Sequence, residues 1–404
     1  MEDKEFVRKY SLLTRRKASI PTPNLFILDD ALVDKLEEHT EPMAFDYETS
    51  GLKWMEKGYQ IRSVSFHNND ISLAIDLCNP KVKESTRKRL LDYIANHKGL
   101  IAHNAMFEAG VTFAMTKISP AILCCTRGLA MQLAGEGSPG QSWGLKALAR
   151  ELLGWEDWSK GLDMGNCMGM DWEVLGRYNQ IDSAATWELF CMMREIVDQH
   201  KDTWGQFFWE YHQQDFLNLV DLQVETYFHG LNIEVESTQL YSQTVGQEIL
   251  DKKAIFLEHE DIAPGVKAFN DSVIDEFQKG LNLIPKFKKD GKTTVRWKIA
   301  IQTLEELKAS QNFNINSAKH LCWLFYEYLK IEPPQLTKSG APSVAAESLE
   351  RIPIYGELIL DYRSSIATFN FLRALLSTQK GGLVRIPIKV PGTITGRCSS
   401  GEVE

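Results

Sequence analysis

Two acidic residues in an otherwise apolar segment could bind a metal ion. Asp46 and Glu48 lie two positions apart in Met43–Thr49, whose other residues are typical of a buried strand, so both side chains leave the same face of a sheet. Buried carboxylates so close together repel each other unless a cation lies between them. Mg²⁺ or Mn²⁺, which prefer carboxylate oxygen, would satisfy the pair. Alone, such a pair is more often part of a solvated strand edge, so further acidic residues are needed to distinguish a metal site from such an edge.

Two later segments supply such residues. The short strand pattern Leu100–His103 leads into Asn104-Ala105-Met106-Phe107-Glu108, which puts Glu108 about one helical turn beyond the strand. Tyr178 and Asp182 are four residues apart in a helical pattern, so a phenol and a carboxylate share one helix face. Tyr178 alone would be interpreted as a half-buried core residue. The set as a whole predicts a carboxylate site.

The surrounding patterns predict the elements that position these residues. Strands are expected at 43–49, 61–66, 71–77 and 100–103, a hairpin turn at 67–70, a helix at 81–96, and mainly helices from 105 to 200. Strands followed by a strand–helix alternation indicate a mixed α/β sheet flanked by helices. Beyond residue 201 the pattern is helical at 216–228, 241–260 and 345–377, and a strand is expected at 384–390.

The three acidic segments resemble the proofreading motifs of a known class of nucleases. Asp46-Tyr47-Glu48-Thr49, His103-Asn104-x-x-Phe107-Glu108 and Tyr178-x-x-x-Asp182 are similar in order and separation to the motifs of the DEDDy 3′–5′ exonucleases found in A-family, DNA polymerase I-like enzymes. The resemblance covers roughly residues 24–205 and implies a ribonuclease H-like fold. Arg177 stands where the histidine variant of the class carries its base, which indicates the tyrosine variant.

The resemblance implies a role for each motif residue. Asp46, Glu48, Glu108 and Asp182 would bind two divalent ions, Mg²⁺ or Mn²⁺, and Tyr178 would orient the attacking water. Three further residues would contact the terminal nucleotides of DNA, namely Leu52, Asn104 and Phe107. Glu108 departs from the family pattern, which has aspartate there. The extra methylene lets the carboxylate reach about 1.5 Å further, so we expect retained but retuned activity.

The second half resembles the thumb of the same polymerases. Leu222–Leu231 is similar to the helix and turn that lead into the thumb, and Thr337–Val344 to its Thr-Lys-x-Gly-x-x-Ser turn. Thr393-Ile394-Thr395-Gly396-Arg397-Cys398-Ser399-Ser400 is close to a signature at the thumb–palm boundary, where Arg397 would contact the minor groove of duplex DNA. In the family the polymerase carboxylates follow this signature. We therefore expect an incomplete palm strand, no polymerisation by this chain alone, and binding to a separate palm-and-fingers polypeptide if one exists.

A basic segment falls inside the thumb-like region. The chain has 404 residues and a net charge of −9, yet residues 286–298 hold five more basic than acidic side chains. Such a segment is more often a solvated loop. If the thumb resemblance holds, its lysines would bind the phosphates of duplex DNA, namely Lys286, Lys288, Lys289 and Lys292.

Several classes of protein are disfavoured. No apolar run approaches the ~18–20 residues of a membrane span, and Met1–Tyr10 lacks the apolar core of a signal peptide. Seven cysteines without a CxxC pair indicate neither a zinc site nor a disulfide framework. We expect a reducing, cytoplasmic setting, the host cytoplasm if the gene belongs to a phage.

The sequence thus predicts four regions and one preferred function. The regions are an N-terminal arm (1–23), an exonuclease domain (24–205), a helical thumb-like region (206–380) and the start of a palm (381–404). The preferred function is 3′–5′ exonucleolytic hydrolysis of DNA by a part of an A-family DNA polymerase. Two alternatives stay open: an RNA-trimming exonuclease with the same motifs, and a DNA-gripping subunit of a split polymerase with weak or no nuclease activity.

Overall fold

The structure, a computed structural model, describes residues 17–134, 142–286, 293–310, 312–389 and 399–400. The chain divides into two units. We call Met1–Asn232 with Leu383–Glu404 the sheet unit and Ile233–Gly382 the helical unit. The predicted Arg397, Lys288, Lys289 and Lys292 and most of the N-terminal arm lie outside the described residues.

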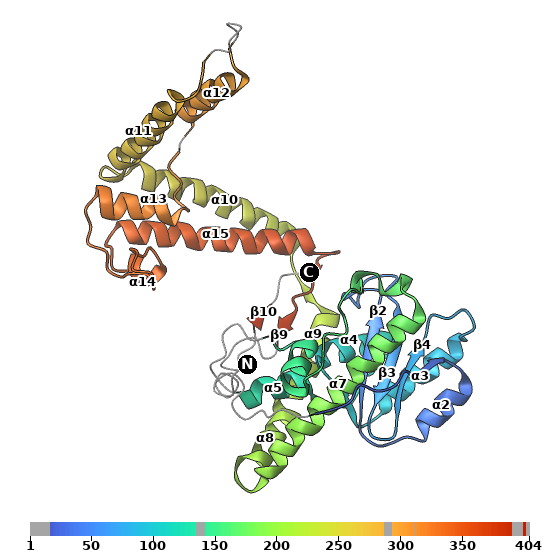
Figure 1. Ribbon diagram of the computed structural model, residues 1–404. Helices are drawn as coiled ribbons and strands as arrows, with labels where there is room; N and C mark the ends of the chain where they lie inside the picture. The colour runs from blue at the N-terminus through green and yellow to red at the C-terminus, as the bar shows by residue number, and fades with distance from the viewer. Residues whose placement is uncertain (1–16, 135–141, 287–292, 311, 390–398, 401–404) are drawn as a thin grey trace. The chain divides into compact units, whose positions relative to one another are not determined.

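A mixed six-stranded sheet forms the centre of the sheet unit (Figure 1). Its order is β1-β4-β3-β2-β5-β6. β2, β3 and β4 pair antiparallel, whereas β1 pairs parallel with β4, and β5 pairs parallel with β2 and β6. The strands are β1 Leu25–Ile27, β2 Met43–Thr49, β3 Ile61–His67, β4 Ser72–Asp76, β5 Leu100–Ala102 and β6 Ile122–Cys125.

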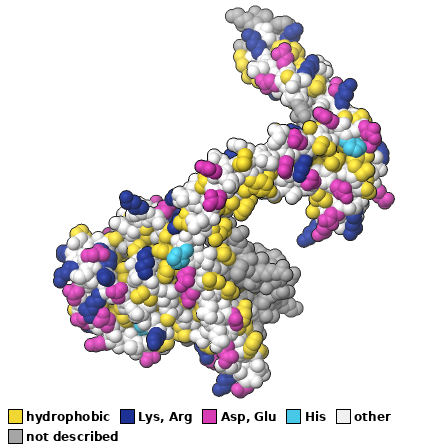
Figure 2. Space-filling view, turned by 180° about the vertical axis from the view of Figure 1, so that it is seen from behind, with side chains coloured by type: hydrophobic (Ala, Val, Ile, Leu, Met, Phe, Trp, Pro, Cys, Tyr) yellow, Lys and Arg dark blue, Asp and Glu magenta, His cyan; other side chains and the backbone are white. Residues whose placement is uncertain are grey.

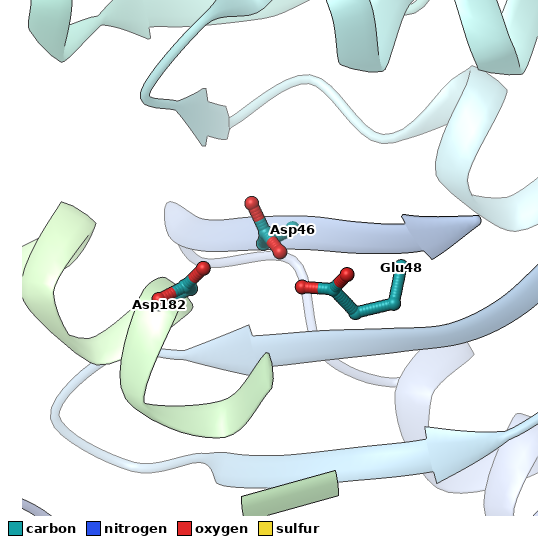
Figure 3. A group of neighbouring side chains, drawn as sticks. All are labelled: Asp46, Glu48 and Asp182. Carbon is teal, nitrogen blue, oxygen red and sulfur yellow. The ribbon is translucent and has the colours of Figure 1, made fainter. Parts of the chain in front are cut away.

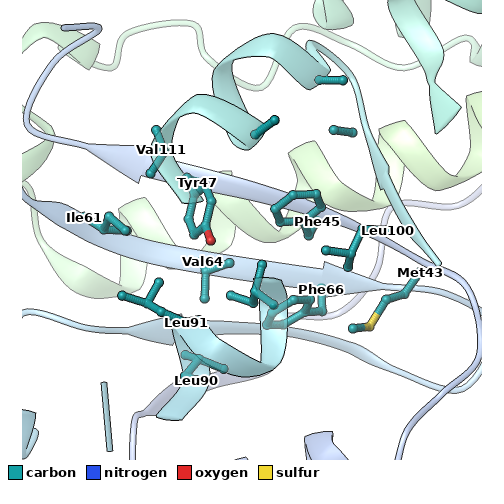
Figure 4. Close-up of a cluster of buried hydrophobic side chains, with 14 of the residues drawn as sticks. Met43, Phe45, Tyr47, Ile61, Val64, Phe66, Leu90, Leu91, Leu100 and Val111 are labelled. Carbon is teal, nitrogen blue, oxygen red and sulfur yellow. The ribbon is translucent and has the colours of Figure 1, made fainter. Parts of the chain in front are cut away.

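Alternate residues of β2 enter two different cores. Met43, Phe45 and Tyr47 are buried on the face covered by α2, α3, α4 and α9, and Figure 4 shows them among the side chains of the neighbouring strands and helices. Ala44 is buried on the other face, among residues of α5, α6 and α7. Because the period of a strand is two residues, Asp46 and Glu48 lie on this second face with Ala44.

Helix α7 is the element that covers the second face of the sheet. It runs from Trp172 to Gln199 and contacts β2, β3, β4 and β5 (Figure 1). Its N-terminus is capped by Asp171, whose carboxylate accepts from the backbone N–H groups of Glu173 and Val174. The other helices of the unit are α2 Asp30–Glu37, α3 Glu84–Asn96, α4 Ala105–Thr116, α5 Thr126–Ala134, α6 Leu145–Leu148, α8 Gln206–Tyr211 and α9 Leu217–His229.

The helical unit has its own core, in which the long helices α10 (Val235–Glu258) and α15 (Tyr355–Thr378) pack together. Phe256, Phe325 and Ile359 are fully buried in it. A smaller cluster joins α11 (Ile262–Leu281) to α12 (Val295–Ala309), with Leu281, Ala300 and Leu304 at its centre. The other helices described in this unit are α13 Ala318–Cys322, the π-helix Trp323–Tyr328 and α14 Ala346–Leu349.

The structure confirms the predicted fold class, a mixed sheet flanked by helices followed by a mainly helical region. β2 has the predicted bounds, and the other three predicted strands differ by one or two residues. The strand predicted at 384–390 is interrupted: β8 spans Leu383–Val384 and β9 spans Ile388–Lys389, with Pro387, which has no N–H to donate, between them. β8 pairs with β7 (Leu231–Asn232), and β9 with β10 (Ser399–Ser400).

Two further features of the described residues concern helix hydropathy and surface charge. None of the helices that the structure describes is long and apolar enough to cross a membrane. Figure 2 shows basic and acidic side chains interspersed over the face in view, without a large area of one sign. The acidic side chains on this face are therefore mixed with basic ones.

The contact between α4 and Trp54 gives a test of the packing. A Cβ atom at Gly110 would lie 2.5 Å from Cε2 of Trp54, whose side chain is 6% exposed. We expect Gly110→Ala to lower the free energy of unfolding by ~1–3 kcal/mol through overpacking, measured as the midpoint of urea unfolding. Gly280 in α11 has nothing within 4 Å of such a Cβ, so Gly280→Ala should be neutral or stabilising by up to ~1 kcal/mol. Equal effects of the two variants would contradict the packing described.

Candidate metal centre

Three carboxylates from two elements converge on the second face of the sheet. Asp46 and Glu48 extend from β2 and Asp182 from α7, with their carboxyl groups turned toward one another (Figure 3). One ligand atom of each lies within 4.8 Å of the other two. Among the residues that the structure describes, these three carboxylates form a group whose ligand atoms lie close enough together to bind a metal ion.

The surroundings of these carboxyl groups disfavour their charged forms. Burial raises the pKa of Asp46, and the neighbouring Asp182 raises it further. Burial also raises the pKa of Glu48, followed by the charges of Asp46 and Asp182. A divalent cation would reverse this penalty, and a set of carboxylate oxygens is what hard cations such as Mg²⁺ and Mn²⁺ prefer. The donor set therefore fits a divalent ion.

Asn179 fixes the orientation of Asp46. Its Nδ2 donates to Asp46 Oδ2 at 2.8 Å and to the Asp46 carbonyl at 3.2 Å. Its Oδ1 accepts from Ser63 Oγ at 3.0 Å, and its own carbonyl accepts from Ser65 Oγ at 2.7 Å. Asn179 is fully buried, so these bonds fasten α7 to β2 and β3 at the position of the carboxylates.

Lys146 and Trp158 hold the two oxygens of Asp182. Lys146 Nζ donates to Oδ2 at 2.5 Å, and Trp158 Nε1 donates to Oδ1 at 2.6 Å. Burial raises the pKa of Asp182, and the ammonium group of Lys146 opposes that rise. Asp182 thus has a defined orientation before any metal ion is considered.

Tyr178 lies one helical turn before Asp182, as its spacing predicted. Its side chain is 8% exposed, and the Lys146 ammonium lies 4.4 Å from the centre of its ring. Burial raises the pKa of Tyr178, and the charges of Asp182, Glu48 and Asp46 raise it further. The phenol therefore stays protonated and can donate a hydrogen bond.

Glu108 is buried near these residues but outside the group of three. It lies in the first turn of α4 and is 3% exposed, and within the part of the chain that the structure describes its Oε2 has no hydrogen-bond partner. Burial raises its pKa, and the charge of Asp46 raises it further. A buried carboxylate oxygen without a partner is costly, so Glu108 has an acceptor to offer a ligand.

The residues expected to contact DNA have different degrees of exposure. Leu52 follows β2 and is 82% exposed. Asn104 is the exposed N-cap residue of α4, and Phe107 is half-buried in the first turn. Lys286 lies in the helical unit, where its Nζ is 5.8 Å from the centre of the Trp297 ring. Nothing in the geometry of these four residues identifies a ligand by itself.

Sequence reasoning missed four residues of this centre: Lys146, Trp158, Asn179 and Cys167. The Sγ of Cys167 donates to Glu48 Oε2 at 3.6 Å. Asn179 had a usable signal, since it directly follows Tyr178 and lies on the buried side of a predicted helix. Lys146 and Trp158 had none, because only the tertiary fold brings 146 and 158 to residue 182.

Comparison with known proteins gives matches over different parts of the chain. The family model for the 3′–5′ exonuclease of A-family DNA polymerases matches residues 27–198. A DNA polymerase of Bacillus phage SP01 is 24% identical over 257 residues, which cover 60% of this chain and 26% of that protein. The solved POL domain of Pol1 from M. smegmatis, in complex with DNA primer-template and dNTP, has a TM-score of 0.62 at 14% identity, covering 93% of this chain and 55% of that one.

These matches agree with the motifs and the fold. The chain spans about a quarter of the phage polymerase and just over half of the solved chain, and the structural likeness shows the fold. Every motif residue from Asp46 to Asp182 falls inside the matched range. The resemblance predicted from the sequence is confirmed for the exonuclease region: residues 27–198 match the family model for the 3′–5′ exonuclease of A-family DNA polymerases.

Proposed function

We propose that this domain removes nucleotides from the 3′ end of DNA by hydrolysis assisted by two divalent ions, Mg²⁺ or Mn²⁺. The observation that carries the proposal is the group formed by Asp46, Glu48 and Asp182, whose ligand atoms lie within 4.8 Å of one another. Its position inside the exonuclease match supports it. Glu108 would complete the ligand set with the carboxylate oxygen that has no hydrogen-bond partner among the described residues.

The protein's own residues have separate tasks in this proposal. Bound divalent ions would lower the pKa of a water and stabilise the leaving 3′ oxygen. Tyr178, protonated and beside Asp182, would orient the attacking water through its hydroxyl. Asn179 donates to Asp46 Oδ2 at 2.8 Å, which would hold this carboxylate in position to bind a metal ion. The products would be deoxynucleoside 5′-monophosphates.

The contacts to DNA in this proposal follow from position and chemistry. Leu52, at 82% exposure, and Phe107 would pack against the terminal bases, which tolerates any sequence. Asn104 would bind the adjoining backbone. Lys286 with Lys288, Lys289 and Lys292 would bind duplex phosphates, and Arg397 would contact the minor groove of the duplex.

The first test is removal of one carboxylate. Asp46→Ala should lower exonuclease turnover on a single-stranded DNA oligonucleotide with Mg²⁺ by more than about a hundredfold, ~2.7 kcal/mol of barrier. Tyr178→Phe keeps the ring and should cost less. Asp198→Ala is the matched control, because Asp198 lies on α7 and pairs with Arg194 at 2.6 Å on the surface.

The melting temperature of each variant reports whether it is folded. A loss of less than about tenfold for folded Asp46→Ala would contradict the metal assignment. Turnover of RNA without turnover of DNA would favour the RNA-trimming alternative. A wild-type chain that binds DNA without cleaving it would favour the DNA-gripping one.

The second test concerns Glu108. If its unpaired oxygen binds metal, Glu108→Gln should reduce turnover by at least about tenfold. Glu108→Asp should leave turnover similar or higher, because it restores the family's residue. Both variants are assayed over a Mg²⁺ titration, since a lost ligand also raises the concentration required. Unchanged turnover of Glu108→Gln would remove Glu108 from the site.

The third test uses pH. The pKa values of Asp46, Glu48, Asp182 and Glu108 are all raised, chiefly by burial. Groups with raised pKa values stabilise the fold below the ordinary carboxyl range and lose that contribution as the pH rises through the raised values. In EDTA, the wild-type melting temperature should therefore fall as the pH rises above the ordinary carboxyl range, and more steeply than that of Asp46→Asn/Glu48→Gln. Parallel pH profiles of the melting temperature in wild type and in the double variant would show that the pKa values of these carboxylates are not raised.

A further inference from the structure

We propose that Lys146 is a positioning residue that serves as the protein's own counter-cation in this site and competes with divalent ions for the Asp182 carboxylate. The proposal rests on the proposed function, since it takes the three carboxylates to be a metal centre. It assigns to Lys146 two opposing effects. The lysine stabilises the metal-free domain, and it weakens the binding of metal.

The geometry places the ammonium group inside the site. Lys146 Nζ lies 2.5 Å from Asp182 Oδ2, with the Lys146 side chain 26% exposed and that of Asp182 6% exposed. The same nitrogen lies 4.4 Å from the centre of the Tyr178 ring and 5.3 Å from that of Trp158. Two aromatic faces thus stabilise the cation from its sides.

The charge of Lys146 acts on all three carboxylates. It is the basic side chain that lowers the pKa of Asp46, Glu48 and Asp182 against the burial that raises them. One positive charge does not balance three negative ones, so the site retains attraction for divalent ions. An ion that binds there must displace the ammonium group or lie beside it, and either event has an electrostatic cost.

The surrounding fold keeps Lys146 in this place. The carbonyl of Trp143, three residues before it, accepts from His103 Nε2 at 3.0 Å, and Thr126 Oγ1 donates to His103 Nδ1 at 2.9 Å. Burial lowers the pKa of His103 to about 3, so the ring stays neutral and keeps both bonds. On the other side, Leu148 is fully buried in the core beneath α7. The second motif, through His103, therefore helps to position the lysine.

A surface ion pair offers a matched control. Lys252 Nζ lies 2.9 Å from Asp361 Oδ1 in the helical unit, and its side chain is also 26% exposed. Its partner Asp361 is 63% exposed and lies outside the carboxylate group. Loss of Lys252 removes an ion pair whose lysine is as exposed as Lys146, without changing the charge of the candidate metal centre.

The experiment compares melting temperatures and metal binding of the full chain. Wild type, Lys146→Met, Lys146→Gln, Lys146→Arg and Lys252→Met are melted in EDTA and in saturating Mn²⁺, and Mn²⁺ binding is titrated by calorimetry. The two neutral variants at 146 should melt lower than wild type in EDTA, gain more from Mn²⁺, and bind Mn²⁺ about tenfold more tightly. Lys146→Arg should respond to Mn²⁺ as wild type does. Lys252→Met should shift equally in both conditions.

Two results would overturn the inference, and they differ from failure of the proposed function. Mn²⁺ affinity of Lys146→Gln that is unchanged or weaker than wild type would show that the lysine does not compete with metal. If Mn²⁺ raises the melting temperatures of the neutral Lys146 variants no more than that of Lys252→Met, Lys146 forms only an ordinary ion pair with Asp182. If Mn²⁺ does not raise the melting temperature of wild type, the proposed metal centre is wrong, and so is the proposed role of Lys146.

Discussion

Repulsion among buried carboxylates is the constraint on which this site depends. Asp46 and Glu48 come from one strand face and Asp182 from the helix that crosses it, and burial raises the pKa of each. Without neighbours the three groups would move apart or take up protons. Asn179, Lys146 and Trp158 oppose both outcomes by donating to carboxylate oxygens at 2.5–2.8 Å, but burial still leaves the three pKa values raised. A divalent ion would supply the positive charge that the three carboxylates still lack.

The sheet and α7 can hold that arrangement because they are joined at the site itself. Asn179 binds the side chain and carbonyl of Asp46 and also contacts Ser63 and Ser65 on β3. A rotation of α7 by one residue, about 100°, would break all of these bonds. It would also turn Asp182 away from β2. The register of one helix on one sheet thus determines the chemistry.

The sequence predicted the parts of this site that have a local period. Alternation placed Asp46 and Glu48 on one strand face, and four-residue spacing placed Tyr178 beside Asp182. The strand β6 (Ile122–Cys125) had no such signal, because a buried parallel strand is apolar on both faces and does not alternate. Lys146 and Trp158 were not predictable either, since their roles arise only when distant segments meet at Asp182.

The location of the site also limits what the helical unit can contribute to it. The carboxylates and the side chains that hold them, from Asp46 to Asp182, all belong to the sheet unit. The helical unit has a separate core around Phe256 and Phe325, so changes within that core need not disturb the register of α7 on the sheet. The helical unit therefore contributes none of the side chains described for the carboxylate group. The hydrolytic step itself depends on whether α7 keeps its register on β2 and β3.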